Sequence, residues 1–274
     1  MMNSIALGQY IPADSPVHRL DPRCKLLLTV AAMVAIFISD SFPSIFLWGA
    51  FLPYIAYNSK IPFSAMLRSA KPIIFLIVFT SIMHLFLTSG DPLITIFGLS
   101  ITAQGVVMAF KLSMRLLYLV MYASILSLTT SPSELSDGLE ILLSPLKKIG
   151  FPAHETAMMM TIALRFIPTL FEETERIMKS QASRGADFET GGLIKRAKSY
   201  IPILIPMFVL IFQRADTLAS AMEARCYRGG RGRVRMYPLA WKKADSIASI
   251  IFLLFIMLAV FADRLLLQCA MLLK

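Results

Sequence analysis

Five apolar segments, separated by short connections and one long charged stretch, constrain the fold of this sequence more than any other feature. They run over approximately residues 25–39, 42–57, 72–87, 103–128 and 247–262. Hydrophobic residues make up 57% of the 274, too large a share for a soluble domain, because a soluble domain must also cover its surface with polar groups. About 20 apolar helical residues cross a hydrocarbon core, and snorkelling Lys side chains with local bilayer thinning extend the shorter segments. The sequence therefore predicts an all-α, polytopic membrane protein with about five transmembrane helices.

The positions of Lys and Arg predict how these helices are oriented. Of the 27 basic residues, 17 lie within residues 130–245, whereas the connections near Asp40 and over residues 88–102 contain none. Because cytoplasmic connections carry an excess of Lys and Arg, the N-terminus and the long stretch are expected in the cytoplasm and the C-terminus outside the cell membrane. Topology and the anionic lipid of the bilayer then account for the net charge of +10, and nucleic acid is not an expected partner.

The long basic stretch is too long for a simple connection and predicts a cytoplasmic domain of its own. The chain then divides into residues 1–129 with about four transmembrane helices, residues 130–240 with about three cytoplasmic helices, and residues 241–274 with the last transmembrane helix. The first cytoplasmic helix starts with Ser131 and Glu134 placed as in a capping box and ends near Lys148.

Two long helices follow in the predicted cytoplasmic domain, and both contain proline. One is expected from Pro152 to Arg184 with a kink at Pro168. The other is expected from Leu193 to Tyr227 or Arg228, with bends at Pro202 and Pro206, because proline removes a backbone hydrogen bond and clashes with the preceding turn.

The ends of these two helices resemble each other. Each carries one arginine among small residues, in the runs Ala182-Ser183-Arg184-Gly185 and Ala224-Arg225-Cys226. Small neighbours let a helix tip enter a groove, and the guanidinium supplies five donors to carboxylates and carbonyls. A basic residue at a helix C-terminus also simply complements the helix dipole, worth about 0.3–1 kcal/mol. The repetition favours a pair of docking tips.

Catalytic and metal-binding patterns are missing from the sequence. His18, His84 and His154 have no metal-ligand spacing, and the glycine cluster at residues 229–232 lacks the Lys-Ser/Thr of a phosphate loop. No catalytic site, metal or cofactor is therefore expected, which argues against a membrane-anchored enzyme. A stand-alone secondary transporter is the alternative, and it requires ionisable residues near the bilayer midplane, usually in paired repeats.

Lys111 and Arg115 are the ionisable residues inside an apolar segment, four residues apart on one helix face. Two interpretations stay open for them. They form either a functional pair at membrane depth or a pair that snorkels to the outer interface.

Several motifs together are similar to those of one known family. These are Gly8-Gln9-Tyr10-Ile11-Pro12, His18-Arg19-Leu20-Asp21-Pro22-Arg23, Thr129-Thr130-Ser131-Pro132, Leu164-Arg165-Phe166-Ile167-Pro168-Thr169-Leu170 and Ala221-Met222-Glu223-Ala224-Arg225. Over essentially its whole length, the sequence resembles the transmembrane T component of energy-coupling factor transporters, a branch of the ABC importers.

The resemblance implies partners and site residues. In that family two Ala-Arg-Gly motifs end the long coupling helices, and each docks into a groove on one of two ABC-type ATPase subunits. Arg184 and Arg225 take those roles by resemblance, with Ser183 in place of the first alanine and Cys226 in place of the second glycine. The loss of glycine at 226 argues against a left-handed cap there, and Gly229 or Gly230 can provide the stop instead.

The resemblance also implies a mechanism in which the partner ATPases bind ATP and Mg²⁺ and move a membrane S component that binds vitamins or other micronutrients. The length and the long insert are more similar to the shared form, which serves many S components, than to a dedicated form. A methionine-rich surface would suit such a changing partner, and the candidates are Met158, Met159, Met160 and Met207. An ordinary intramolecular core for these methionines remains the equal alternative.

Overall fold

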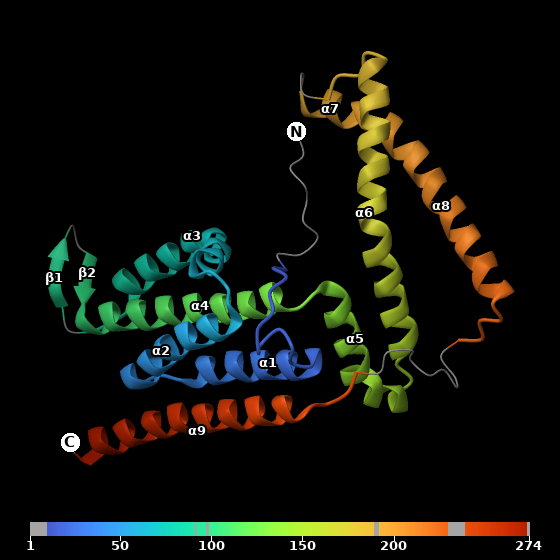
Figure 1. Cartoon of the computed structure of the whole chain (residues 1–274). Helices are drawn as coiled ribbons and strands as arrows, with labels where there is room; N and C mark the ends of the chain where they lie inside the picture. Colours follow the sequence, from blue (N-terminus) through green and yellow to red (C-terminus); the bar gives the residue numbers. More distant parts are fainter. Residues whose placement is uncertain (1–9, 91, 97–98, 189–191, 230–238, 273–274) are drawn as a thin grey trace. The chain divides into compact units, whose positions relative to one another are not determined.

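The computed structural model describes residues 10–90, 92–96, 99–188, 192–229 and 239–272, and its internal contacts divide the chain into two compact units (Figure 1). The first unit combines Met1–Leu139 with Leu239–Lys274, and the second is Glu140–Pro238. The described part is helical except for one small hairpin, which agrees with the predicted all-α class.

The first unit contains five long helices and the hairpin. The helices are α1 (Pro22–Ile38), α2 (Phe42–Ser59), α3 (Phe63–Leu87), α4 (Ala103–Thr129) and α9 (Lys243–Leu272), and the strands β1 (Pro92–Ile96) and β2 (Leu99–Thr102) pair antiparallel. The sequence analysis did not foresee these strands. It also placed the start of the third helix near Pro72, whereas α3 begins at Phe63, so Arg68 and Lys71 lie in its first turns.

Four helical stretches of the described chain are long and apolar enough to cross a membrane. They are Phe63–Leu87, Ala103–Thr129, Ile194–Ala224 and Lys243–Arg264. The helices α1 and α2, with 17 and 18 residues, measure about 25–27 Å, short of the bilayer core of about 30 Å. The stretch Ile194–Ala224 lies in the predicted cytoplasmic domain. A membrane protein is therefore established, and the number of five spans stays a prediction.

An aromatic cluster forms the centre of the first unit. Trp48 of α2 is 1% exposed, and its ring meets Tyr122 of α4 and Phe255 of α9 edge-on, with centroids 5.4 and 4.9 Å away. The polar groups of both rings have hydrogen-bond partners. The Tyr122 hydroxyl donates to the Trp48 carbonyl at 3.1 Å, and Trp48 Nε1 donates to Ser39 Oγ at 3.2 Å. Buried aromatic groups that find a hydrogen-bond partner fix orientation as well as burying area.

One end of the first unit is joined by the buried carboxylate of Asp245. Its two oxygens accept the backbone N–H groups of Asp21 and Lys242, each at 2.7 Å. Asp21 in turn caps α1 by accepting the Arg23 N–H at 2.9 Å, and it forms an ion pair with the Arg23 guanidinium. Arg23 also donates to the Leu239 carbonyl at 3.0 Å. The Asp-Pro-Arg motif at residues 21–23 is thus a structural joint between α1 and the start of α9.

The segment before α1 is held by a neutral histidine. His18 Nε2 donates to the Ile11 carbonyl at 3.1 Å, and His18 Nδ1 lies 2.7 Å from the Ser15 hydroxyl. Burial lowers the pKa of His18 below its ordinary value, which keeps the ring neutral near pH 7. The Ile11 N–H donates to the Leu128 carbonyl at 3.0 Å, so this segment lies against the end of α4.

The opposite end of the first unit is joined by Asp263 of α9 and by Arg115 of α4. Asp263 accepts the N–H groups of Asp40 and Ser41 at 3.2 and 2.6 Å. Arg115 donates to the Ser39 carbonyl and to the Asp40 carboxylate, both at 2.6 Å. The nitrogen of Lys111 lies 5.1 Å from the centre of the Phe42 ring. These contacts favour a structural role for Lys111 and Arg115 at the turn between α1 and α2.

The second unit contains a 3₁₀ helix at Ser144–Ile149, the long helices α6 (Ala153–Ser183) and α8 (Ile201–Ala224), and the short α7 (Leu193–Ser199). The helix α5 (Pro132–Leu143) runs into it from the first unit. The predicted capping box is confirmed, since the Glu134 N–H donates to Ser131 Oγ at 3.3 Å and the Ser131 N–H donates to Glu134 Oε2 at 3.1 Å. Pro145 ends the α-helical geometry earlier than predicted, because its ring cannot follow a regular turn.

The predicted helix over 193–227 is divided in the structure. It breaks at Tyr200, between α7 and α8, and Pro202 lies in the first turn of α8. Pro202 has no backbone N–H and so cannot donate the hydrogen bond that a continuous helix needs at this position, whereas proline is well suited to the first turn of a helix. Pro168 and Pro206 lie inside α6 and α8, and the predicted bends at these two residues stay predictions.

We expect the substitution Asp245→Ala to lower the melting temperature of the purified protein by about 5–10 °C, because the buried N–H of Asp21 and the partly buried N–H of Lys242 lose their acceptor, at about 1–3 kcal/mol for a buried group. Asp216→Ala, at an exposed position on α8, serves as the control. Equal melting temperatures for both variants, measured by intrinsic fluorescence in the same detergent, would show that Asp245 does not join the helices.

Candidate functional site

The C-terminal end of α6 has the geometry of a Schellman cap. Gly185 has a φ of +87°, its N–H donates to the Ala182 carbonyl at 2.9 Å, and the Ala186 N–H donates to the Gln181 carbonyl at 3.0 Å. This pair of bonds satisfies carbonyls that a helix end leaves without intrahelical partners. Arg184 is thereby the last residue before the chain turns away.

The end of α8 repeats this geometry. The Cys226 N–H donates to the Glu223 carbonyl at 2.8 Å, and the Tyr227 N–H donates to the Met222 carbonyl at 3.0 Å. Arg225 has φ −90° and ψ 13°, close to the −91° and 9° of Arg184. The two tips are therefore alike in backbone conformation as well as in sequence.

The expectation that the missing glycine removes the left-handed cap at 226 is wrong. Cys226 has a φ of +56° and occupies the position that Gly185 has in the first tip. A side chain in this region costs about 1–2 kcal/mol, and the two cap hydrogen bonds offset this cost. Gly229 also has a positive φ, +79°, but it follows the cap and does not end the helix.

Both tips are open to a partner. Ser183, Arg184 and Gly185 are exposed, as are Ala224, Arg225 and Cys226. Within the described chain, neither guanidinium forms an ion pair or a hydrogen bond, and a Cβ placed on Gly185 would meet no atom within 4 Å.

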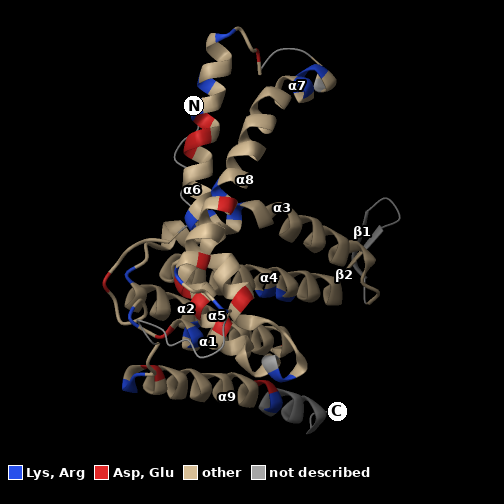
Figure 2. Cartoon of the chain, turned by 90° about the vertical axis from the view of Figure 1, so that its right-hand side faces the viewer, with Lys and Arg blue, Asp and Glu red and all other residues tan. Residues whose placement is uncertain are grey.

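The long helices of the second unit cross, so the tips lie far apart. Glu173 of α6 pairs with Arg214 of α8 at 3.4 Å, and the Thr174 hydroxyl lies 3.3 Å from the Met207 sulfur. Helix α6 runs toward α7 and α8 runs away from it, so the C-terminal ends of α6 and α8 lie at opposite ends of the pair (Figures 1 and 2). Each tip is therefore accessible to a separate partner.

The four methionines of the sequence analysis are not brought together into one surface. Met159 and Met160 are 59% and 40% exposed, whereas Met158 is half-buried and Met207 faces α6 through Thr174. Sequence reasoning did not identify a larger apolar surface on α8. Its exposed side chains include Ile205, Phe208 and Phe212, at 61%, 58% and 65%.

Metal chemistry finds no support in the described residues, among which no group of three His, Cys, Asp or Glu side chains could hold an ion. His154 of α6 instead pairs with Glu140, with Nδ1 and Oε1 2.8 Å apart.

Cys226→Gly should strengthen the tip of α8, because glycine adopts a positive φ without the steric cost of a Cβ. Hydrogen exchange of peptides covering residues 222–228 should slow by about fivefold, equivalent to about 1 kcal/mol. Gly185→Ala provides the matched opposite change and should accelerate exchange over residues 181–187. If Cys226→Gly left exchange unchanged while Gly185→Ala accelerated it, the two caps would not be equivalent.

The comparisons with known proteins agree on one family. The model of a family described as cobalt transport protein matches residues 13–237. A protein of Thermanaerovibrio acidaminovorans is 51% identical over 246 residues, covering 89% of this chain and 91% of its own length. One of Acidaminococcus fermentans is 50% identical over 260 residues (94% and 97%), and one of Bacillus subtilis is 43% identical over 247 residues (90% and 93%).

All three relatives bear the name energy-coupling factor transporter transmembrane protein EcfT. The matches extend over both units of the fold and over both helix tips. The chain belongs to this cobalt transport protein family, together with the transmembrane proteins of energy-coupling factor transporters.

Proposed function

We propose that this protein is the coupling subunit of an ABC-type importer and transmits ATP-driven motion from two ATPase subunits to a substrate-binding S component. The observation that carries the proposal is the pair of matching helix tips, each with an exposed arginine at the C-cap position and a left-handed residue after it. A single such end is ordinary, but two of the same geometry at opposite ends of one helix pair suit two similar partners.

The chemistry of the tips fits a protein groove. The left-handed residue turns the chain away directly after the arginine, which leaves the guanidinium projecting with small side chains around it. A guanidinium with five donors binds carboxylates and carbonyls in a fixed geometry, and arginine is enriched at the energetic centres of interfaces. We infer that Arg184 and Arg225 each enter one ATPase subunit, with Ser183, Gly185, Ala224 and Cys226 allowing close approach.

The crossed helices provide the mechanical connection. With 31 and 24 residues, α6 and α8 are about 46 and 36 Å long. They pack where Glu173 and Thr174 meet Arg214 and Met207. Because packed helices move as nearly rigid bodies, a displacement of either tip is transmitted through this crossing.

The apolar surfaces of the same helices suit the S component. Met159 and Met160 on α6 and the exposed aromatic residues of α8, Phe208 and Phe212, are available for a partner within or beside the bilayer. Methionine side chains adapt to different partner shapes, which agrees with a shared form that serves several S components. Met158 and Met207 contribute less surface, because both are partly buried.

We infer the orientation from the basic residues of the first unit, which are more numerous at the end where α1 and α9 begin, where Arg23, Lys242 and Lys243 join Arg19, Lys25 and Lys60. Arg19, Lys25 and Lys60 line one cavity beside the end of α4 and the start of α9. Lys111, Arg115 and Arg264 lie toward the other end. With the many basic residues of the second unit, the positive-inside rule places the N-terminus and the coupling helices in the cytoplasm and the C-terminus outside.

Catalysis and substrate choice are assigned to the partners. ATP and Mg²⁺ would bind to the ATPase subunits, so this chain would be no enzyme and need no cofactor of its own. The S component would select the substrate, a vitamin or another micronutrient.

Charge reversal at the tips tests the docking. Arg184→Glu and Arg225→Glu should each weaken co-purification with the ATPase subunits by at least about tenfold, and the double variant should lose them, because a like charge or an unpaired buried charge costs about 2–5 kcal/mol. Lys198→Glu, a charge reversal at an exposed position on α7, should retain both ATPases. Retention of both ATPases by a folded double variant would exclude the tips as docking sites.

The S-component surface is tested separately. Met159→Glu combined with Met160→Glu should release the S component while both ATPases stay bound, because a buried charge at an apolar interface is costly. Met207→Leu, a conservative change at the helix crossing, is the control. Loss of the ATPases together with the S component would show that the double change disrupts the coupling helices themselves.

A further inference from the structure

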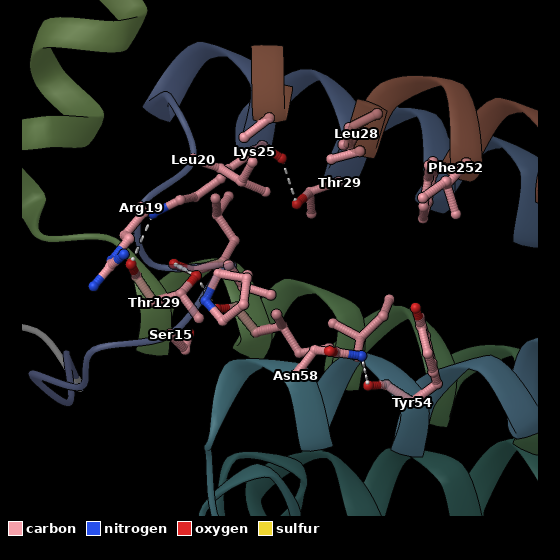
Figure 3. A pocket seen from close by; sticks show the side chains of 18 of the residues that line it. Ser15, Arg19, Leu20, Lys25, Leu28, Thr29, Tyr54, Asn58, Thr129 and Phe252 are labelled. Carbon is pink, nitrogen blue, oxygen red and sulfur yellow. Dashed lines mark hydrogen bonds between the residues drawn. The ribbon is translucent and has the colours of Figure 1, made fainter. Parts of the chain in front are cut away.

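The first unit contains a cavity that the proposed coupling function does not use. It has a volume of about 740 Å³ and lies between α1, α2, α4, α9 and the segment that precedes α1 (Figure 3). Cavities of about 300–1,000 Å³ are typical of sites for small molecules.

The cavity is amphipathic along its length. Figure 3 places Ser15, Arg19 and Thr129 at one end and Phe252 and Tyr54 toward the other. Further apolar side chains line the cavity, namely Leu28, Ala32, Phe51, Ile55, Ile247 and Ile251.

The apolar part reaches the surface of the unit. Ile247 and Ile251 of α9 are 58% and 47% exposed, and Tyr54 of α2 is 56% exposed. A hydrocarbon chain can therefore enter from the side, between α2 and α9, without crossing the polar end.

The polar end carries an excess of positive charge. Arg19, Lys25 and Lys60 line it together with one acid, Asp14. Asp14 is already paired with Arg19, with a nitrogen–oxygen distance of 2.7 Å. The other two cations, Lys25 and Lys60, have no further acid among the residues that line the cavity.

Lys25 is the more unusual of the two because it is 5% exposed. Its Nζ donates to the carbonyls of His18 and Thr129 at 2.9 and 3.0 Å. An ammonium group has three donors, and within the described chain Lys25 forms no ion pair. The carboxylates of Glu134, Asp21 and Asp245 act on it only from a greater distance.

A buried charge without a counter-ion is costly, so the site favours a ligand that brings an anion to Lys25. The adjoining apolar space favours a ligand that also carries a hydrocarbon chain. Basic pockets between transmembrane helices at the cytoplasmic side are suited to anionic lipid headgroups.

We propose that this cavity binds one anionic phospholipid, with its phosphate at Lys25 and Lys60 and one acyl chain along Leu28, Phe51 and Phe252. The site is independent of the docking tips, since every lining residue belongs to the first unit. A lipid held there joins α1, α2, α4 and α9 at the end where α9 begins.

The test is native mass spectrometry of the full-length chain in neutral detergent, titrated with dioleoylphosphatidylglycerol. We expect one lipid per chain and affinity at least about tenfold weaker for dioleoylphosphatidylcholine. Lys25→Met should weaken phosphatidylglycerol binding by about tenfold, through loss of a charge-assisted hydrogen bond, and Lys60→Gln by about fivefold.

Steric and charge-matched controls complete the design. Ala248→Trp fills the cavity and should abolish binding, whereas Ile250→Trp on the exposed face of α9 and Lys71→Gln on α3 lie outside it and should bind as the wild type does. If Lys25→Met does not fold, the lipid affinities of Lys60→Gln and Ala248→Trp still test whether the cavity binds the phospholipid.

Equal affinity for the two phospholipids, or unchanged binding by Ala248→Trp, would overturn the proposal. If oleate or inorganic phosphate bound while phosphatidylglycerol did not, the proposal would be overturned as well. Because the assay contains neither ATPases nor S component, its result is separate from that of the co-purification experiments.

Discussion

Two buried carboxylates on α9, Asp245 and Asp263, hold the first unit together from its two ends. Asp245 accepts the Asp21 N–H at the start of α1, and Asp263 accepts the N–H groups of the turn between α1 and α2. Both contacts join residues more than 200 positions apart in the chain. Hydrogen bonds to a buried charge are among the stronger ones, so the last helix is tied to the first pair, and the aromatic cluster around Trp48 fills the space between them.

The second unit follows a different principle, because its helices bury little apolar surface against each other. A Schellman cap ends each long helix with an arginine at the tip. The cap hydrogen bonds fix the backbone at each end, while the apolar sides of α6 and α8 stay uncovered within the unit. That combination of capped tips and open sides is suited to a part that transmits motion between partners.

Local rules predicted several elements to within a residue or two. The capping box at Ser131 and the boundaries of α6 follow from short-range hydrogen bonding and from proline and glycine positions, which act within a few residues. The small hairpin over residues 92–102 was missed, because apolar β-branched residues in a connection resemble a short apolar run. The predicted helix end at Tyr227 or Arg228 was wrong, since α8 ends at Ala224. The preference of glycine for a positive φ is a tendency, and the two cap hydrogen bonds of Cys226 and Tyr227 outweigh it.

The sequence by itself determined that this is a helical membrane protein of the energy-coupling factor family, since apolar length, basic connections and family motifs are readable along the chain. Only the tertiary structure decided what Asp21, Arg23 and Arg115 do, because their partners lie far away in sequence. The same holds for the cavity at Lys25, whose walls come from four helices and the segment before them. Periodicity and propensity describe the neighbours of a residue along the chain, whereas burial and charge pairing depend on which helices pack together.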